Sequence, residues 1–465
     1  MMKNEMMKNG MSKSGGMRGK LLAVLLCGVM LAGCGTGEGL SPAVGAGESV
    51  GLVNPEGAQE QPTQTQESKE EQGEMEAREE QAALESVETD GMCERAAYFA
   101  DMVYQAGGSE NTMVSPLSLD MALGLVAGGA QGKTKEELQA YLGREDYGSF
   151  AKAYMEFAEG LNYGDSEQAD MGGYKIAYEI ANSIWVKDDR KLVEDYVAKM
   201  QEQYQAEIAS VSFAPAQAAN TVSRINGWCK EKTHDLIPSV LSEDDISEEM
   251  AAILVNSLYF ESPWAESWKL VPHTFTDLDG KESNQEMLTD TLGVYYENEY
   301  ATAFSKPYMN GMEFVGILPK AEGEFSVQDL DLESLLKNGS TEYDVLAMMP
   351  KLNFETTANN VVGILRAQGV ETVFDAAESD LSGLIQMGGG EVTYISDIIQ
   401  KCKLELDEDG TRAAAVTMAI ARFNSVMMPE VKEQKEVYLD RPFAFMIYDS
   451  ENEQIVFIGK VVKAD

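Results

Sequence analysis

Acid–base and metal chemistry have few possible positions in this chain. It contains two histidines, His234 and His273, and neither forms a workable Ser/His/Asp arrangement or accompanies a G-x-S-x-G motif. The cysteines at 27, 34, 93, 229 and 402 lack the clustering of zinc sites and are too sparse for a disulfide scaffold. We therefore expect no catalytic residues and no enzyme activity, and we expect neither a metal site nor a cofactor.

Residues 411–422 carry a pattern that points instead to a conformational reaction of the backbone. Small side chains occupy alternate positions, namely Thr411, Ala413, Ala415, Thr417, Ala419 and Ala421. Between them lies a bulkier set, Arg412, Ala414, Val416, Met418, Ile420 and Arg422. Because successive strand residues point to opposite faces, this period of two predicts a strand that can enter a tight slot, with both arginines in solvent. The alternative is an Ala-rich surface loop or a short helix, which local propensity favours.

The elements that must position this segment are helices followed by strands. Apolar residues at helical spacing predict helices over 93–104 and 118–130, and residues 134–137 fit a capping box that begins another helix. Strand-like runs follow at 251–260 and 314–318, and 443–448 and 455–462 read as a hairpin. Neither a repeat nor a linker interrupts residues 91–465, so we expect one large α+β domain there.

The first 33 residues have the order of an export signal. Basic residues precede the apolar run 21–33, which is shorter than the roughly 20 residues of a membrane span. The run ends in Leu-Ala-Gly-Cys34, which resembles the bacterial lipobox. We therefore expect cleavage before Cys34 and a lipid on its thiol, with an ordinary secretory signal as the alternative. The protein would be exported and lipid-anchored on the outer face of a bacterial membrane or cell surface, with later shedding left open.

Residues 34–90 read as an acidic, disordered tether. From 35 to 90 there are 14 acidic residues against Lys69 and Arg78, with almost no large apolar side chains. A tolerated low-complexity spacer is the alternative. The whole chain has a formal net charge of −42, which argues against nucleic acid as a partner. Membrane contact is expected only through the lipid on Cys34.

Residues 408–415, Glu-Asp-Gly-Thr-Arg-Ala-Ala-Ala, resemble the reactive-loop hinge of the serpins, a family of serine-protease inhibitors. Residues 440–445 and 457–462 look like the closing strands of that family. Further similar segments follow in family order: 111–138, 181–186, 225–228, 254–260, 317–320, 349–351 and 380–383. The resemblance spans essentially all of 91–465. It implies a large central β-sheet with additional sheets, N-terminal helices and an exposed reactive loop.

The resemblance also implies a suicide-substrate mechanism, in which the loop is cleaved and inserts while the acyl-enzyme is still formed. The target would be a serine protease or, alternatively, a cysteine protease, and the inhibitor a monomer. The implied hinge residues are Glu408, Gly410, Thr411, Ala413, Ala414 and Ala415. Counting along the loop places the reactive bond at Asn424–Ser425. A long return to Phe443, with Phe423, Met427 and Met428 as further recognition residues, leaves 427–429 as an alternative.

A buried polar cluster that controls sheet opening in the family is matched by Ser115, Ser118 and Asn256. Gln400 stands where the family usually has histidine; glutamine supplies a donor and an acceptor but no protonation switch. Trp264 matches the tryptophan at the point where insertion begins. His234 and His273 are expected to be surface or structural, and Cys93, Cys229 and Cys402 to be buried thiols. A noninhibitory serpin acting as a binding or chaperone-like module is the alternative function.

Overall fold

The computed structural model describes residues 91–108, 110–162, 175–386, 392–411 and 432–464. They all lie within one compact unit, Gln64–Asp465. The helices are α2 (Met92–Ala106), α3 (Pro116–Ala127), α4 (Gly132–Leu142), α5 (Tyr147–Gly160), α6 (Glu194–Tyr204), α7 (Ala218–Lys232), α8 (Leu332–Lys337) and α9 (Val361–Ala367). No helix in these ranges is long and apolar enough to cross a membrane.

A six-stranded sheet, called the central sheet below, carries the segment of interest. Its strands in order are β11 (Leu352–Ala358), β12 (Ile395–Leu406), β13 (Gly410–Thr411), β4 (Ala252–Pro263), β2 (Ala177–Lys187) and β3 (Glu207–Val211). The apolar run of β4 is buried along its whole length. A strand that is buried on both faces needs no alternation, which explains the unbroken apolar runs 252–255 and 258–260 within it.

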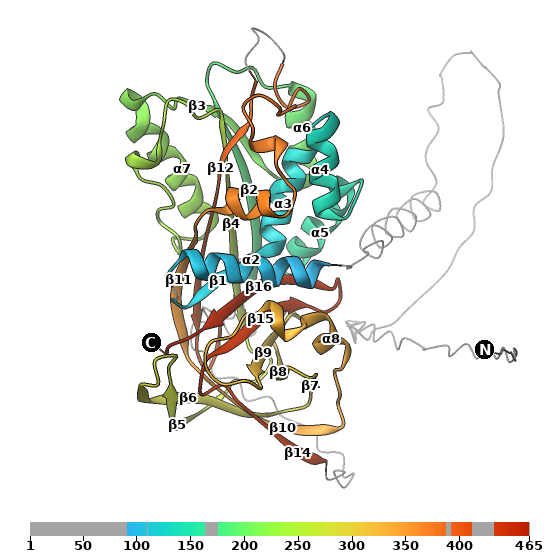
Figure 1. The fold of residues 1–465 in the computed structure, drawn as a ribbon, viewed down its shortest axis with the longest axis vertical. Coiled ribbons are helices and arrows are strands. Elements are labelled where there is room, and N and C mark those ends of the chain that lie inside the picture. The colour runs from blue at the N-terminus through green and yellow to red at the C-terminus, as the bar shows by residue number, and fades with distance from the viewer. Residues whose placement is uncertain (1–90, 109, 163–174, 387–391, 412–431, 465) are drawn as a thin grey trace, which may run out of the picture. The chain divides into compact units, whose positions relative to one another are not determined.

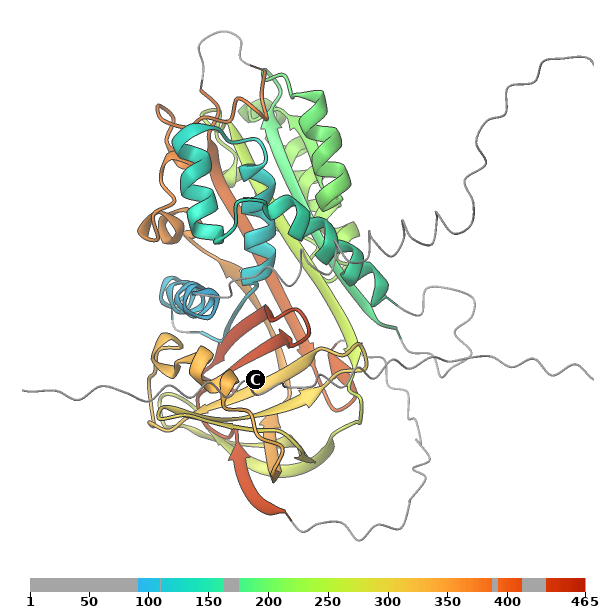
Figure 2. The same ribbon diagram turned by 90° about the vertical axis from the view of Figure 1, so that its right-hand side faces the viewer.

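Two further sheets lie together at one end of the central sheet (Figure 2). One has six strands, β1 (Thr112–Val114), β16 (Gln454–Val461), β15 (Phe443–Asp449), β9 (Glu313–Pro319), β8 (Ala301–Pro307) and β7 (Tyr295–Glu297). The other has four, β14 (Glu433–Tyr438), β10 (Tyr343–Pro350), β6 (Glu282–Leu292) and β5 (Lys269–Thr276). The expected hairpin is the antiparallel pair β15 and β16. The α+β fold with N-terminal helices and a large central sheet is therefore confirmed.

Helices cover both faces of the central sheet (Figure 1). On one face, which we call the α3 face, Leu254 and Leu258 of β4 and Leu404 of β12 join the main core with α3. On the other, the α7 face, Ile253 and Ile399 pack with α7 in a second cluster. Because strand side chains alternate, even-numbered residues of β4 and β12 lie on the α3 face and odd-numbered ones on the α7 face.

The expected capping box at 134–137 is wrong, although the helix itself is present. Helix α4 begins at Gly132, and its N-cap residue, Gln131, makes no side-chain cap. The Thr134 hydroxyl instead accepts a hydrogen bond from the Asp380 amide at 3.0 Å. The Glu137 carboxylate accepts from the amides of Glu371 and Thr372 at 2.9 and 2.7 Å. Both side chains therefore bind a distant loop, and this tertiary contact overrides the local motif.

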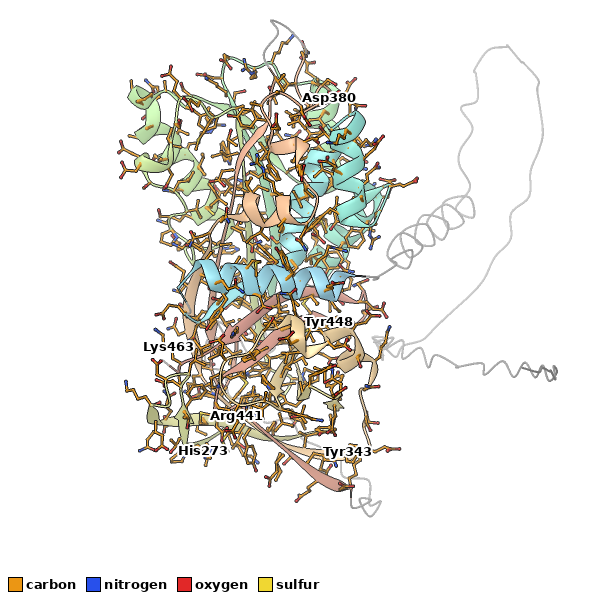
Figure 3. All side chains as sticks on the ribbon, viewed as in Figure 1. His273, Tyr343, Asp380, Arg441, Tyr448 and Lys463 are labelled. Atoms are coloured by element: carbon orange, nitrogen blue, oxygen red, sulfur yellow. The ribbon has the colours of Figure 1, made fainter. Side chains whose placement is uncertain are left out.

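In the described part of the chain, each histidine lies beside a carboxylate, and the cysteines are buried or partly buried. His234 Nε2 lies 2.7 Å from Glu179, and His273 Nε2 lies 3.1 Å from Asp440. Figure 3 shows His273 near Arg441, at the end of the domain remote from Asp380. Cys229 and Cys402 are buried thiols, as expected, whereas Cys93 is only partly buried. Burial raises the pKa of Cys229 and of Cys402 to about 12, which makes both poor nucleophiles.

Candidate functional site: an open seam in the central sheet

Strands β12 and β4 pair with each other along only part of their length. They run parallel, and their pairing extends from Ile395 with Ala252 to Gln400 with Asn256. Beyond that point the described residues show no pairing between the facing edges of 401–405 and 257–261, which we call the seam. Backbone groups at such an edge are open to a further strand.

Strand β13 occupies the far end of this seam. Thr411 pairs antiparallel with Leu406 of β12 and with Ser262 of β4, and Gly410 pairs with Pro263. Thr411 is only 4% exposed. Its hydroxyl lies 2.7 Å from that of Tyr308, so the two share a hydrogen bond. The hinge residues Gly410 and Thr411 thus already form a strand of the central sheet.

Two tryptophans, Trp264 and Trp268, hold the turn before β13. Together with Tyr308 we call them the clamp. Trp264 donates its indole N–H to the Asp407 carbonyl at 2.9 Å and its amide to the Asp409 carbonyl at 2.9 Å. The Trp268 amide donates to the Glu408 carbonyl at 2.9 Å. Trp264 also stacks on Tyr308, with ring centroids 4.1 Å apart. Trp264 therefore lies at the turn through which the chain enters β13.

The acidic side chains of this turn are unequally stabilised. Glu408 forms an ion pair with Lys351, and the hydrogen bond from Lys351 lowers the pKa of Glu408. Partial burial, followed by repulsion from Asp407 and Glu408, raises the pKa of Asp409. Asp407 accepts backbone hydrogen bonds from Asp409 and Gly410 at 2.9 and 3.3 Å. These contacts fix the turn so that residue 411 points into the seam.

The registers on the two sides of the seam coincide. Leu406 and Ser262 both flank Thr411, and 406 minus 262 is 144. Gln400 and Asn256 pair directly in the closed part, and 400 minus 256 is also 144. A strand continuing from β13 would therefore meet matching positions on both neighbours. The two strands need only to separate sideways by one strand spacing, about 4.8 Å, without sliding along each other.

The buried polar cluster lies at the closed end of the seam, on the α3 face. Ser115, Ser118, Asn256 and Gln400 are each no more than 1% exposed. Gln400 accepts from the Ser115 amide at 3.0 Å and donates to the Ser115 carbonyl at 2.9 Å. Ser118 donates to Asn256, which donates to Asn182 at 2.7 Å. The cluster therefore connects the start of α3 to β12, β4 and β2.

Replacing Gln400 with leucine should destabilise the protein measurably. The change leaves the Ser115 amide and carbonyl without these partners in a buried site, which costs about 2–4 kcal/mol. We expect unfolding by urea to have a lower midpoint concentration, as monitored by tryptophan fluorescence. Asn220→Leu is the matched control, because Asn220 makes an exposed hydrogen bond to Gln217 at 2.8 Å. Equal midpoints for both variants would show that the two Gln400 bonds contribute nothing net.

The predicted site residues that the structure describes lie in two groups, one at each end of the seam. Glu408, Gly410, Thr411 and Trp264 meet at one end of the seam, and the buried polar cluster lies at the other. Cys34, Ala413, Ala414, Ala415, Asn424 and Ser425 lie outside the described residues. Sequence reasoning missed Tyr308 and Trp268 in the clamp and Asn182 in the cluster. Trp268 lies just before β5, Tyr308 just after β8 and Asn182 on β2, and no local motif marks them.

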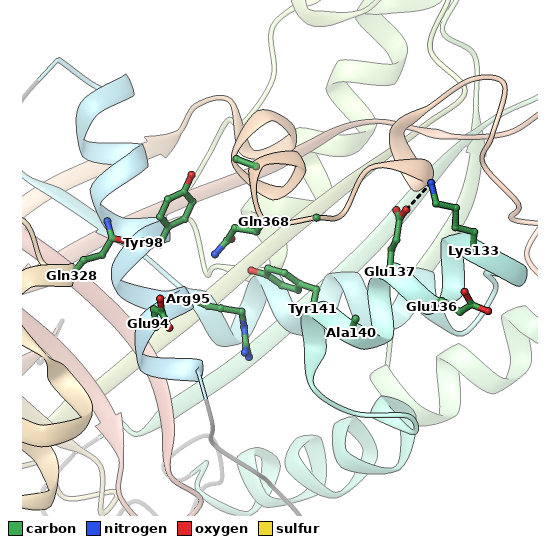
Figure 4. Close-up of a pocket in the computed structure, with 12 residues that line it drawn as sticks. Glu94, Arg95, Tyr98, Lys133, Glu136, Glu137, Ala140, Tyr141, Gln328 and Gln368 are labelled. Atoms are coloured by element: carbon green, nitrogen blue, oxygen red, sulfur yellow. Dashed lines mark ion pairs between the residues drawn. The ribbon is translucent and has the colours of Figure 1, made fainter. Parts of the chain in front are cut away.

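A hollow lies elsewhere in the domain, between α2, α4 and α9 (Figure 4). It has a volume of about 890 Å³ and is lined by both acidic and basic side chains. Lys133 and Glu137, which line it, form an ion pair at 3.2 Å. None of the lining residues belongs to the seam or its clamp. In the described ranges, no group of three or more His, Cys, Asp or Glu residues is placed to hold a metal ion.

Comparison with known proteins agrees with this architecture. The family model described as "Serpin (serine protease inhibitor)" matches residues 93–464. A "Serine protease inhibitor" of Cyanea capillata is 28% identical over 78% of this chain and 95% of its own length. An uncharacterized serpin-like protein of Thermococcus kodakarensis is 30% identical, covering 77% of this chain and 82% of its own.

Solved structures give the same result for the fold. The crystal structure of the thermophilic serpin tengpin in the native state has a TM-score of 0.66 and 28% identity. The match covers 80% of this chain and 94% of tengpin. An Arabidopsis serpin in its native stressed conformation also has a TM-score of 0.66, with 22% identity and coverage of 82% and 98%. On the family match over 93–464 and the shared fold, the chain belongs to the serpin family.

Proposed function

We propose that this protein is a suicide-substrate inhibitor of serine proteases that traps the acyl-enzyme by inserting its reactive loop into the central sheet. The observation that carries the proposal is the seam with β13 at its mouth. There the loop has begun a strand, and the register of both neighbours is set for its continuation. Several relatives are named as protease inhibitors, which favours this function over the noninhibitory alternative.

Extending the β13 register assigns a place to each loop residue in the inserted state. Residue 413 would lie between Phe260 and Leu404, and residue 417 between Asn256 and Gln400. These neighbours are on the crowded α3 face. The loop offers only Thr and Ala at the odd positions that would face them. Small side chains therefore meet the tight face, which is the condition for a strand to enter a packed sheet.

The other side chains would meet a different environment. Met418 would lie between Val255 and Ile399, which belong to the apolar cluster beneath α7. Bulkier apolar side chains are suited to this place because α7 and the sheet enclose them. In this register the small side chains of the loop would meet the α3 face, and the bulkier ones would meet the α7 face.

Insertion would also improve the pairing of the sheet. It replaces one parallel pairing, between β12 and β4, with two antiparallel pairings, which are slightly more stable per residue. It also gives partners to the backbone groups of the seam. The uninserted fold can therefore store free energy that cleavage of the loop releases.

The proposed reaction begins as ordinary proteolysis. The protease serine oxygen attacks the carbonyl carbon of Asn424, and the bond to the Ser425 nitrogen breaks as that nitrogen takes a proton. The acyl ester then joins the protease to Asn424. Insertion would draw this ester away before water hydrolyses it. Cleavage within 427–429 and a cysteine protease target are the alternatives that we retain.

The test is to incubate residues 34–465 with a panel of serine and cysteine proteases and to examine the mixtures by denaturing gel electrophoresis. A trapped acyl-enzyme survives SDS as a band of the combined mass. Sequencing the released C-terminal peptide identifies the reactive bond. Cleavage without a trapped band across the whole panel would support the noninhibitory alternative instead.

We also propose that residues 1–33 are a signal peptide, that 34–90 are an acidic tether, and that a lipid on Cys34 anchors the monomeric 91–465 domain. The supporting pattern is the basic segment, the apolar run and the Leu-Ala-Gly-Cys34 sequence. In a bacterial host, Cys34→Ser should prevent lipid attachment. We expect loss of radiolabelled palmitate from the protein and of the cleaved, membrane-bound form. Unchanged labelling would contradict the proposal.

A further inference from the structure

The hollow between α2, α4 and α9 is lined by polar side chains whose hydrogen-bonding capacity is not used (Figure 4). The ion-pair partner of Arg95 among the described residues is Asp120, and the 3.8 Å between Nη2 and Oδ2 is too long for a hydrogen bond. Arg95 Nε is buried without a hydrogen-bond partner in the described structure, and the same holds for Gln368 Oε1. Buried polar groups normally find a partner. The wall of the hollow therefore offers a guanidinium and a carboxamide to a ligand.

Two tyrosines, Tyr98 of α2 and Tyr141 of α4, give the hollow an aromatic wall. Arg95 lies over the Tyr141 ring, with its Cζ 5.4 Å from the ring centroid. Tyr141 is buried, whereas Tyr98 is half-buried. Figure 4 shows these three side chains and Gln368 toward one end of the hollow, and the ion pair of Lys133 toward the other. A flat apolar ring can pack against such a wall, because aromatic side chains bury a large area and favour offset or edge contacts.

The charges around the hollow limit which ligands it can take. Lys133 already pairs with Glu137 at 3.2 Å, so Arg95 is the one of the two lining cations that has donors to spare. Glu94 and Glu136 are exposed residues of the lining. Together with the net charge of −42, they repel a ligand that carries several negative charges. The combination favours a ligand with a single negative charge, placed beside Arg95.

We propose that this hollow binds a small aromatic monocarboxylate, with its carboxylate at Arg95 and its ring against Tyr98 and Tyr141. The guanidinium offers donors in a fixed fork that matches the two oxygens of a carboxylate, and Gln368 Nε2 adds a further donor. The volume of the hollow, about 890 Å³, lies within the range of small-molecule sites. Because the lining residues lie outside the seam and the clamp, this site does not depend on the proposed inhibitory mechanism.

The experiment measures the binding of benzoate to the full-length chain by ligand-observed NMR titration, without any protease. Benzamide has the same shape without the charge, phthalate has a second carboxylate, and inorganic phosphate has charge without a ring. We expect saturable benzoate binding with a dissociation constant of about 1 mM. We expect each of the three comparison compounds to bind at least about tenfold more weakly. Absence of saturable benzoate binding, or equally tight binding of any comparison compound, would overturn the inference.

Two variants and a matched control locate the site. Arg95→Met should weaken benzoate binding at least about tenfold, and Tyr98→Leu about threefold. The control is Arg224→Met, which should leave binding unchanged. Arg224 also lies over an aromatic ring, that of Trp185 at 5.1 Å, and beside a carboxylate, that of Glu207 at 3.7 Å, but it does not line the hollow.

Melting curves of the variants show whether each one folds, and Tyr98→Leu decides the matter if Arg95→Met does not. Equal weakening by Arg95→Met and Arg224→Met would contradict the inference, and so would unchanged binding in folded Arg95→Met or Tyr98→Leu. Protease trapping by the wild-type chain is measured separately, so failure of this site leaves the proposed function standing.

Discussion

Ala413→Glu is expected to turn this protein from an inhibitor into a substrate of its target protease. In the proposed inserted register residue 413 would lie between Phe260 and Leu404, which are 4% and 1% exposed. A carboxylate there would be buried in the main core without a partner, at a cost of several kcal/mol. Hydrolysis should then outrun insertion, and we expect the yield of SDS-stable complex to fall at least about tenfold.

The matched control for this prediction is the same substitution one residue later. Ala414→Glu would place its carboxylate on the α7 face, between Tyr259 and Lys403, where Lys403 offers a charge partner. This variant should keep most of the trapping activity. The measurement is the ratio of complex to cleaved inhibitor on a denaturing gel, at matched rates of loop cleavage. If both variants lose trapping alike, the alternation of faces is not what permits insertion.

Cleavage of the reactive loop should make the wild-type protein much more resistant to heat. Insertion of residues 411–424 would pair a strand on both sides, and net contributions of about 0.5–1.5 kcal/mol per backbone hydrogen bond sum to the order of 10 kcal/mol. For a domain of this size that corresponds to a rise in melting temperature of about 10–15 °C. Calorimetry of the intact and the nicked protein measures it directly.

The nicked Ala413→Glu variant provides the internal control for the thermal prediction. It has the same broken bond but should not complete insertion, so its melting temperature should stay near that of the intact protein. A nicked wild type that melts with the intact form would mean that the loop stays outside the sheet. A crystal structure of the nicked protein would then show β12 and β4 still paired from residues 395 and 252.

Local patterns in the chain predicted the elements well where neighbours in sequence decide them. The helices near 93–104 and 118–130 and the hairpin near 443–462 appear close to the expected places. The capping box at 134–137 failed because Thr134 and Glu137 bind residues 371–380, more than two hundred positions away. A local motif carries no information about a partner at that distance.

The period of two from Thr411 to Arg422, the small size of one half of that set, and the family resemblance could all be read without coordinates. They depend only on which side chains follow one another, because alternation is a property of any strand. The matching offsets on the two sides of the seam and the packing of Trp264 on Tyr308 came only from the folded chain. They depend on how β4 and β12, 144 residues apart, are placed against each other, and long-range packing alone decides that register.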